Sequence, residues 1–185
     1  MTQDATTSEM LRMRFFDFGF QYYVAARFAV RAALVPVAGN LFHHAIEMFL
    51  KGELAKHLNE GQRRDFRHGL VELWSEFKKQ ETAGIALASF DPIVETLSKF
   101  EEIRYPENLV LNGMTCTFGF GKATPTVHEG PARSEPDYEL FVGEIDALVK
   151  AILTASGINP KFYTTRHGEH GSTYLQHENQ ESGLW

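Results

Sequence analysis

The sequence predicts an all-α protein built as a bundle of helices around one core. Apolar residues recur at three- and four-residue steps in several segments, and prolines or glycines stand near the segment ends. The chain has 185 residues, which is enough for one domain that needs no covalent staple. Its single cysteine, Cys116, excludes an internal disulfide, and we expect it to be a small half-buried hydrophobe rather than a nucleophile.

The expected helices follow from this periodicity. A first helix is predicted over 10–34, and a second over 37–58 is apolar on most sides, as in a helix buried among its neighbours. After a loop rich in arginine, a third helix is expected over 68–80. Asp91 followed by Pro92 predicts another helix start, since an acid caps helices and proline fits the first turn. The closing helix is expected over 137–156.

Between these helices one segment loses the helical period. Glycine and proline interrupt 108–136, so we expect an irregular insertion before the last helix, in which Thr115 to Phe118 fits a short strand. The predicted organisation is a helical unit over 10–157 and a polar tail over 158–185. We expect this tail to be poorly packed unless a partner or a second subunit holds it.

The net charge and the distribution of apolar residues argue against non-specific nucleic-acid binding and against a membrane span. The formal net charge is −6, whereas non-specific nucleic-acid binders gain affinity from a basic footprint. No run of about 18 uncharged apolar residues predicts a membrane span. The first nine residues are polar and include acids, unlike a secretory signal. We therefore expect a cytoplasmic protein.

A line of polar residues interrupts the apolar second helix. His44, Glu47 and Lys51 fall within about 60° of one another on a helical projection. Buried polar groups must be paired, and Glu47 precedes Lys51 by four residues, the favourable order for a salt bridge. Two hypotheses remain: an internal salt bridge, or a polar groove that faces a ligand or another subunit.

The segment His43-His44-x-x-Glu47 also raises the question of a metal site. Bundle di-metal sites use two Glu-x-x-His pairs with further glutamates. Here the order is reversed and no second copy occurs, so the sequence predicts no metal and no other cofactor.

Two basic motifs lie elsewhere. Arg64 and His68 share a helical face, so they could hold a phosphate and move a proton, although a solvated surface also explains them. Arg104 closes a helix before Tyr105 and Pro106, and a cation is favoured at that end by the helix dipole. The proline keeps the turn rigid, which would also preorganise Arg104 for a phosphate or carboxylate.

In their order along the chain, these motifs resemble the HEPN family. The matching pieces are His44-x-x-Glu47-x-x-x-Lys51, the segment from His68 to Leu73, and Arg104-Tyr-Pro-Glu107, followed by an amphipathic helix. The resemblance covers about residues 20 to 156. Gly69 replaces the aspartate that is frequent in the family, and the insertion at 108–136 is longer than expected.

The resemblance implies an antiparallel up-and-down bundle of four to five helices, often dimeric. Some relatives are metal-independent ribonuclease toxins paired with nucleotidyltransferase antitoxins, and others bind nucleotides or proteins without catalysis. We expect a non-catalytic binding module, with a ligand site formed by residues of the three motifs: His44, Glu47, Lys51, His68, Arg104 and Tyr105. The alternative is a ribonuclease acting through His68, Arg64 and Arg104.

A third hypothesis is that the chain is a structural subunit whose exposed aromatic residues serve only assembly. The first helix carries more aromatic residues than one stripe needs, namely Phe15, Phe16, Phe20 and Tyr23. Core packing explains such residues more often than a purely structural interface does.

Overall fold

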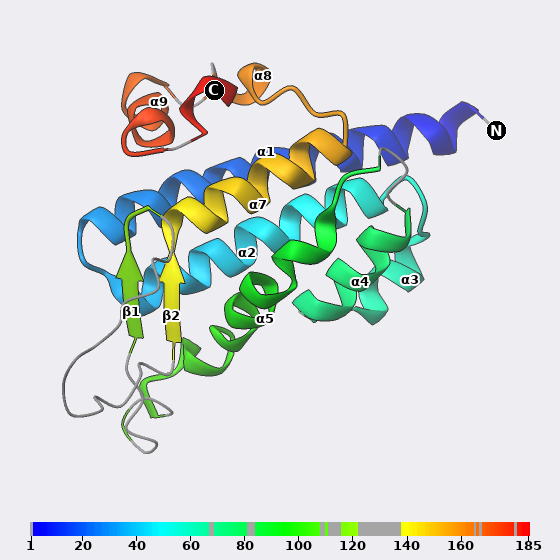
Figure 1. The fold of residues 1–185 in the computed structure, drawn as a ribbon. Coiled ribbons are helices and arrows are strands. Elements are labelled where there is room, and N and C mark those ends of the chain that lie inside the picture. Colours follow the sequence, from blue (N-terminus) through cyan, green and yellow to red (C-terminus); the bar gives the residue numbers. More distant parts are fainter. Residues whose placement is uncertain are drawn as a thin grey trace.

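Helices make up most of the structure, and a small parallel sheet joins them. A computed structural model describes residues 2–66, 69–80, 84–107, 110, 116–121, 138–164, 166, 168–179 and 181–185, without the side chains of 2–6, 63, 64, 104 and 164. The helices are α1 Thr2–Arg31, α2 Val35–Leu54, α3 Glu60–Asp65, α4 Leu70–Gln80, α5 Asp91–Lys99, α7 Val142–Ala155, α8 Lys161–Thr164 and α9 Gly168–Gln176, with 3₁₀ turns η1 Leu87–Phe90, η2 Glu102–Arg104 and η3 Ser182–Leu184 (Figure 1). The strands are β1 Cys116–Gly119 and β2 Tyr138–Phe141. The predicted predominance of helix is confirmed, and none of the described helices is long and apolar enough to cross a bilayer.

The helices α1 and α2 form an antiparallel pair at the centre of the fold (Figure 1). Ser8 near the start of α1 donates a 2.6 Å hydrogen bond to the carbonyl of Ala55 just after α2. Between them, a Cβ atom placed on Gly19 would lie 2.5 Å from the ring of Phe49. Only a glycine at this position leaves room for that ring, so the two helices approach closely here.

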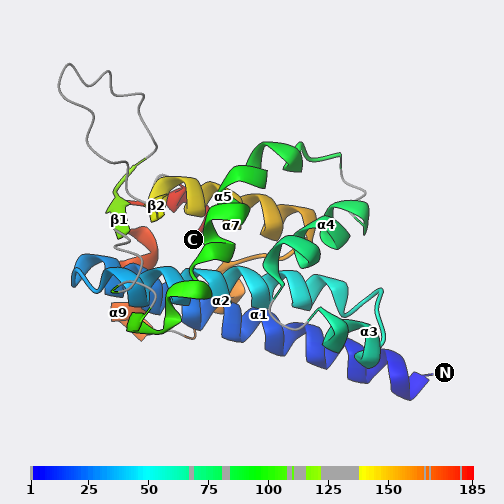
Figure 2. The ribbon, with the colours of Figure 1, turned by 90° about the horizontal axis from the view of Figure 1, so that it is seen from below.

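The helix α7 lies against the same pair. Arg12 near the start of α1 donates a 2.7 Å hydrogen bond to the carbonyl of Ser156 after α7, and Arg27 near the end of α1 pairs with Asp146 near the start of α7. The helix α7 therefore runs antiparallel to α1 and parallel to α2. The helix α5 is steeply inclined to α2 (Figures 1 and 2), so its axis is not aligned with those of α1, α2 and α7.

The prediction of the last helix, over 137–156, was wrong at its beginning. Residues Tyr138–Phe141 form β2, which pairs in parallel with β1, and α7 begins only at Val142. Tyr138 and Leu140 are buried while Glu139 is exposed, which is the two-residue alternation of a strand. The backbone hydrogen bonds of this segment go to β1. The expected short strand near Thr115 to Phe118 is confirmed as β1, whereas most of the insertion at 108–136 lies outside the described residues.

The prediction of an arginine-rich loop after the second helix was also wrong in part, because this segment contains the short helix α3. The backbone N–H of Asn59 donates to Oε1 of Gln62 at 2.9 Å, and the backbone N–H of Gln62 donates to Oδ1 of Asn59 at 3.0 Å. This reciprocal pairing caps the start of a helix. It explains why the chain turns back into a helix at Glu60 soon after α2 ends at Leu54.

The polar tail packs against α1, so the expectation that it would be poorly packed was wrong. The ring of Tyr163 stacks on Phe20 at 4.5 Å between centroids, and the ring of Trp185 meets Phe20 edge-on at 5.8 Å. Leu175 is fully buried. Phe16, Phe20 and Tyr23 are fully buried and serve the core, whereas Phe15 is half-buried. Phe18, Tyr22 and Phe28 of the same helix are exposed, so core packing accounts for only part of its aromatic residues.

A buried ion pair ties α1, α7 and the tail together. The guanidinium of Arg27 donates to the Asp146 carboxylate, and also to the carbonyls of Tyr174 at 2.6 Å and His177 at 2.8 Å. The hydroxyl of Tyr23 donates to the same carboxylate. Burial raises the pKa of Asp146, while Arg27 and the hydrogen bonds oppose that change.

We expect Asp146→Ala to lower the free energy of unfolding by about 3–5 kcal/mol, because it leaves the Arg27 guanidinium buried without its counter-charge. Urea denaturation of the variant and the parent protein measures this difference.

Lys150→Ala is the matched control on the same helix. Lys150 pairs with Glu181 at 2.6 Å, but its side chain is half exposed, so the loss should stay below about 1 kcal/mol. Equal losses in the two variants would contradict a special role for the buried pair.

Candidate functional site

The polar residues of α2 lie inside the protein because helices pack around this helix. The helix α2 contacts α1, α4, α5, α7 and β1, so few of its side chains reach solvent. His43 and Glu47 are both fully buried. A buried carboxylate or imidazole is costly unless it is paired, so the partners of these two residues decide what the site can do.

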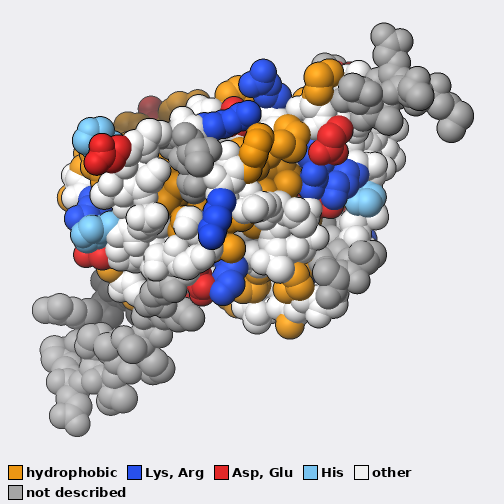
Figure 3. Space-filling model, turned by 90° about the horizontal axis from the view of Figure 1, so that it is seen from above, with side chains coloured by type: hydrophobic (Ala, Val, Ile, Leu, Met, Phe, Trp, Pro, Cys, Tyr) orange, Lys and Arg blue, Asp and Glu red, His pale blue; other side chains and the backbone are white. Residues whose placement is uncertain are grey.

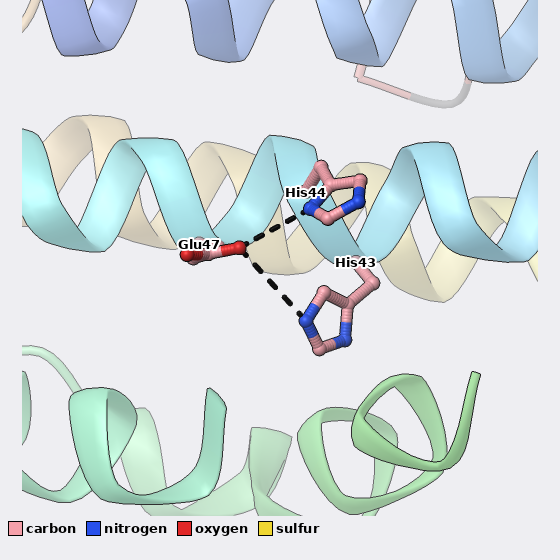
Figure 4. A group of neighbouring side chains, drawn as sticks. All are labelled: His43, His44 and Glu47. Carbon is pink, nitrogen blue, oxygen red and sulfur yellow. Dashed lines mark hydrogen bonds and ion pairs between the residues drawn. The ribbon is translucent and has the colours of Figure 1, made fainter. Parts of the chain in front are cut away.

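Glu47 is the centre of this cluster (Figure 4). Its Oε1 accepts a 2.5 Å bond from Nζ of Lys51, so the predicted salt bridge is confirmed. Its Oε2 lies 3.2 Å from Nδ1 of His44. The line of His44, Glu47 and Lys51 that the sequence predicts is therefore a connected network on one side of α2.

His43 joins the cluster from the adjacent position of the helix. Its Nδ1 lies 3.1 Å from the carbonyl oxygen of Leu97 in α5. A carbonyl only accepts, so Nδ1 carries the proton and Nε2 of the neutral ring carries a lone pair. Nε2 has no hydrogen-bond partner among the described residues, and it lies 4.0 Å from Oε2 of Glu47 and 3.9 Å from Oε2 of Glu101.

Burial lowers the pKa of His43. The Leu97 carbonyl and the carboxylates of Glu47 and Glu101 act in the opposite direction, and His44 adds to the lowering. The desolvation of the charged ring is the largest of these effects, so the neutral form is favoured. The cluster thus holds a neutral imidazole whose lone pair faces two carboxylates.

The structure adds Glu101 to the residues that the sequence indicated. Glu101 follows α5 and its side chain is about one-third exposed. Sequence spacing contains no signal for this contact, because Glu101 and His43 are 58 positions apart. His43 itself stood in the sequence only as part of a weak metal-like pattern, although it precedes Glu47 by one helical turn.

The other predicted site residues are only partly described. The turn η2, which ends at Arg104, contacts α2, and Glu101 just before this turn reaches the polar cluster. Tyr105 is 63% exposed. The side chains of Arg64 and Arg104 and the whole of His68 lie outside the described residues. That these side chains converge with Lys51 therefore stays a prediction.

Two further features lie outside this cluster, a cysteine and a surface groove. Cys116 is half buried in β1, and burial raises its pKa to about 11, so it is a thiol rather than a reactive thiolate at neutral pH. A groove of about 700 Å³ lies between α1 and α8 and is lined by residues that include Met10, Met13, Phe162 and Arg166. Figure 3 shows hydrophobic side chains flanked by charged ones on the surface seen from above.

The cluster also has the composition of a metal site. His43, His44 and Glu47 each offer one ligand atom, and these atoms lie within 4.8 Å of one another. Imidazole and carboxylate are both ligands of zinc and similar ions.

Comparison with known proteins gives no relative for this arrangement. No protein-family model matches the chain, and no curated protein or solved structure matches it significantly.

A glycine allows the contact between α2 and the end of α5. A Cβ at Gly39 would lie 1.9 Å from Cδ1 of Phe100, the residue before Glu101. We expect Gly39→Ala to lower the free energy of unfolding by about 1–3 kcal/mol, because the ring has to move out of a packed core. Urea denaturation checks this, with Gly183→Ala as control, since a Cβ there meets nothing within 4 Å.

The lowered pKa of His43 predicts a pH dependence of stability. Below its usual value of 6.5 the unfolded chain binds a proton that the folded chain resists, so stability falls as pH falls from 6.5 toward the lowered pKa. In His43→Gln we expect the slope in this window to be smaller by up to about 1.4 kcal/mol per pH unit. Urea denaturation from neutral to mildly acidic pH, with a chelator present, measures both slopes.

His170→Gln is the control for that comparison, because this imidazole is exposed on α9. It should keep the slope of the parent protein. A parent slope that His43→Gln leaves unchanged would show that this ring does not resist protonation in the folded state.

Proposed function

We propose that the chain is a HEPN-type module that binds a nucleotide, another phosphate-bearing ligand or a partner protein, without catalysing a reaction. The proposed binding surface consists of His44 and Lys51, the partly exposed ends of the polar line on α2, together with Glu101, η2 and Tyr105. One observation carries the proposal: the polar line of α2 meets the segment that leads into Arg104. The segment that leads into one motif of the resemblance thus contacts the helix that carries another, which supports the proposal.

The chemistry of the surface supports recognition rather than cleavage. Arg104 and Lys51 supply cations, and a guanidinium held by a rigid turn is suited to a phosphate or a carboxylate. Glu47 already holds Lys51, so a ligand anion would be attracted mainly by Arg104. Within the cluster, His43 faces carboxylates, whereas general acid–base cleavage of RNA needs a histidine beside an arginine at the phosphate.

The same resemblance leads us to propose a homodimer and, as a partner, a nucleotidyltransferase. Light scattering on the purified chain tests the first, and co-purification with such a protein encoded next to it tests the second. Neither is required for the binding surface described above.

Arg104→Ala should weaken binding of the ligand at least tenfold, since a charge-assisted hydrogen bond contributes about 1.5–3 kcal/mol and a tenfold change is about 1.4 kcal/mol. Lys51→Ala should weaken it as well. The probes are fluorescent ATP and a labelled single-stranded RNA, measured by fluorescence anisotropy, with circular dichroism to confirm folding.

Lys79→Ala removes an exposed cation on α4, away from this surface, and should bind both probes as the parent protein does. The same RNA is incubated with a chelator and examined on a gel. Cleavage products that form in the presence of the chelator and are absent with His68→Ala would show that the chain is a ribonuclease and not a non-catalytic binding module. Binding that Arg104→Ala and Lys51→Ala both leave unchanged would contradict the proposed surface.

A further inference from the structure

The groove between α1 and α8 contributes no residue to the binding surface proposed above. Its volume of about 700 Å³ lies within the range of roughly 300–1,000 Å³ in which proteins bind small molecules. Four charged side chains line it together with four apolar or aromatic ones, namely Met10, Met13, Phe162 and Tyr163. This mixture fits an occupant that has both an apolar part and a charge.

The apolar wall of the groove is fixed on one side and adaptable on the other. The ring of Tyr163 is buried and stacks on Phe20 of the core, and its hydroxyl donates to Sδ of Met13 at 3.3 Å. Met10 and Phe162, by contrast, are 59% and 50% exposed. A ligand that covers these two side chains removes apolar surface from water, and flexible methionine side chains adapt to its shape.

The charged side chains of the groove favour an anion. Arg14 and Arg166 approach different oxygens of the Asp17 carboxylate, at 4.0 and 3.9 Å, which is too long for a hydrogen bond. Two guanidinium groups thus share one carboxylate, and neither has a side-chain hydrogen bond among the described residues. The other acid of the groove, Glu9, accepts a 3.1 Å bond from Arg12. The pair of arginines therefore suits one further negative charge, brought by a ligand.

Arg166 lies where the apolar wall meets these charges. Its Cζ is 4.8 Å from the centroid of the Phe162 ring, and its backbone N–H donates to the carbonyl of Tyr163 at 3.0 Å. Stacking on an aromatic ring uses the face of the planar guanidinium, whereas its N–H groups lie in the plane. Such an edge binds a carboxylate with two parallel hydrogen bonds. A ligand with two negative charges would be repelled more strongly by Asp17.

We propose that this groove binds a small amphipathic acid, a molecule with an apolar body and one carboxylate. The body covers Met10 and Phe162, and the carboxylate accepts hydrogen bonds from Arg14 and Arg166 beside Asp17. An aliphatic chain and an aromatic ring system both supply such a body, and two probes distinguish them. The site does not rest on the proposed nucleotide-binding function, since the two share no residue.

Decanoate and naphthoate represent the two kinds of body, and the amide of naphthoate is a neutral counterpart of the same shape. Each compound is titrated into the full chain by isothermal titration calorimetry, with decanoate kept below its micelle concentration. We expect one acid to bind saturably per chain, and naphthoate to bind at least about fivefold more tightly than its amide. This preference should shrink as the salt concentration rises, because the arginines are exposed. The acid that binds more tightly identifies the body.

Substitutions of the charged side chains should change the affinity in opposite directions. Arg166→Met keeps an apolar stem without the charge and should weaken naphthoate at least about fivefold, with little effect on the amide. Asp17→Asn removes the competing carboxylate and should strengthen naphthoate by a similar factor. A purely structural role of these residues would not produce opposite signs. Circular dichroism checks that both variants fold, and Lys79→Met, which removes an exposed cation of α4, is the matched control.

The apolar side of the site is tested at Met10, whose exposure makes it dispensable for folding. Met10→Ser should weaken the acid and its amide alike, by about threefold or more, because both lose the same apolar contact. Val71→Ser changes an exposed apolar side chain of α4 and should bind both compounds as the parent protein does.

The proposal fails if the parent chain binds neither acid saturably, or if Arg166→Met and Asp17→Asn both leave the affinity for the acids unchanged. It also fails if light scattering finds a dimer that Met10→Ser dissociates while no acid binds, because a second copy then covers the groove. Loss of ATP or RNA binding in Arg104→Ala concerns the nucleotide-binding surface alone.

Discussion

The buried carboxylate of Glu47 governs the arrangement of the polar groups around α2. Glu47 is fully buried on a helix that other helices surround, so its charge has to be compensated by neighbours rather than by solvent. Lys51 and His44 compensate it along α2, where helical spacing alone brings them into reach. The ring of His43 needs a hydrogen-bond partner of its own, and its Nδ1 donates to the carbonyl of Leu97. One requirement, the pairing of buried polar groups, thus connects α2 to the end of α5.

A second buried network, between α1, α7 and the tail, also pairs buried polar groups. Arg27 and Asp146 compensate each other, and the remaining donors of Arg27 reach carbonyls of the tail. The two networks differ in how their nitrogen atoms are satisfied. Each nitrogen of the Arg27 guanidinium donates to an oxygen, whereas Nε2 of His43 has no hydrogen-bond partner among the described residues.

Elements with a strong local signal were predictable from the sequence. The start of α5 near Asp91 follows from the proline that comes next, and the Glu47–Lys51 pair follows from four-residue spacing. The predicted capping role of Asp91 was wrong, because Phe90 is the N-cap and the Asp91 carboxylate accepts hydrogen bonds from Trp74 and Lys78. The boundary between β2 and α7 was not predictable in this way. Leu140 is apolar and fits either a helix or a strand, and it became a strand residue because β1 offers its backbone a partner. The packed tail was missed for a similar reason, since Tyr163 and Trp185 stand in polar surroundings along the chain and meet aromatic partners only in three dimensions.

For the candidate site, the sequence by itself determined the polar line on α2, because residues three and four apart on a helix share a face whatever surrounds it. It also determined that these groups would be buried, since the rest of the helix is apolar. Only the tertiary structure decided which groups face them. Glu101 and the Leu97 carbonyl come from a segment more than 50 residues away, brought close by the packing of Phe100 against Gly39. The contact depends on the shapes of two surfaces, and no spacing along one chain encodes it.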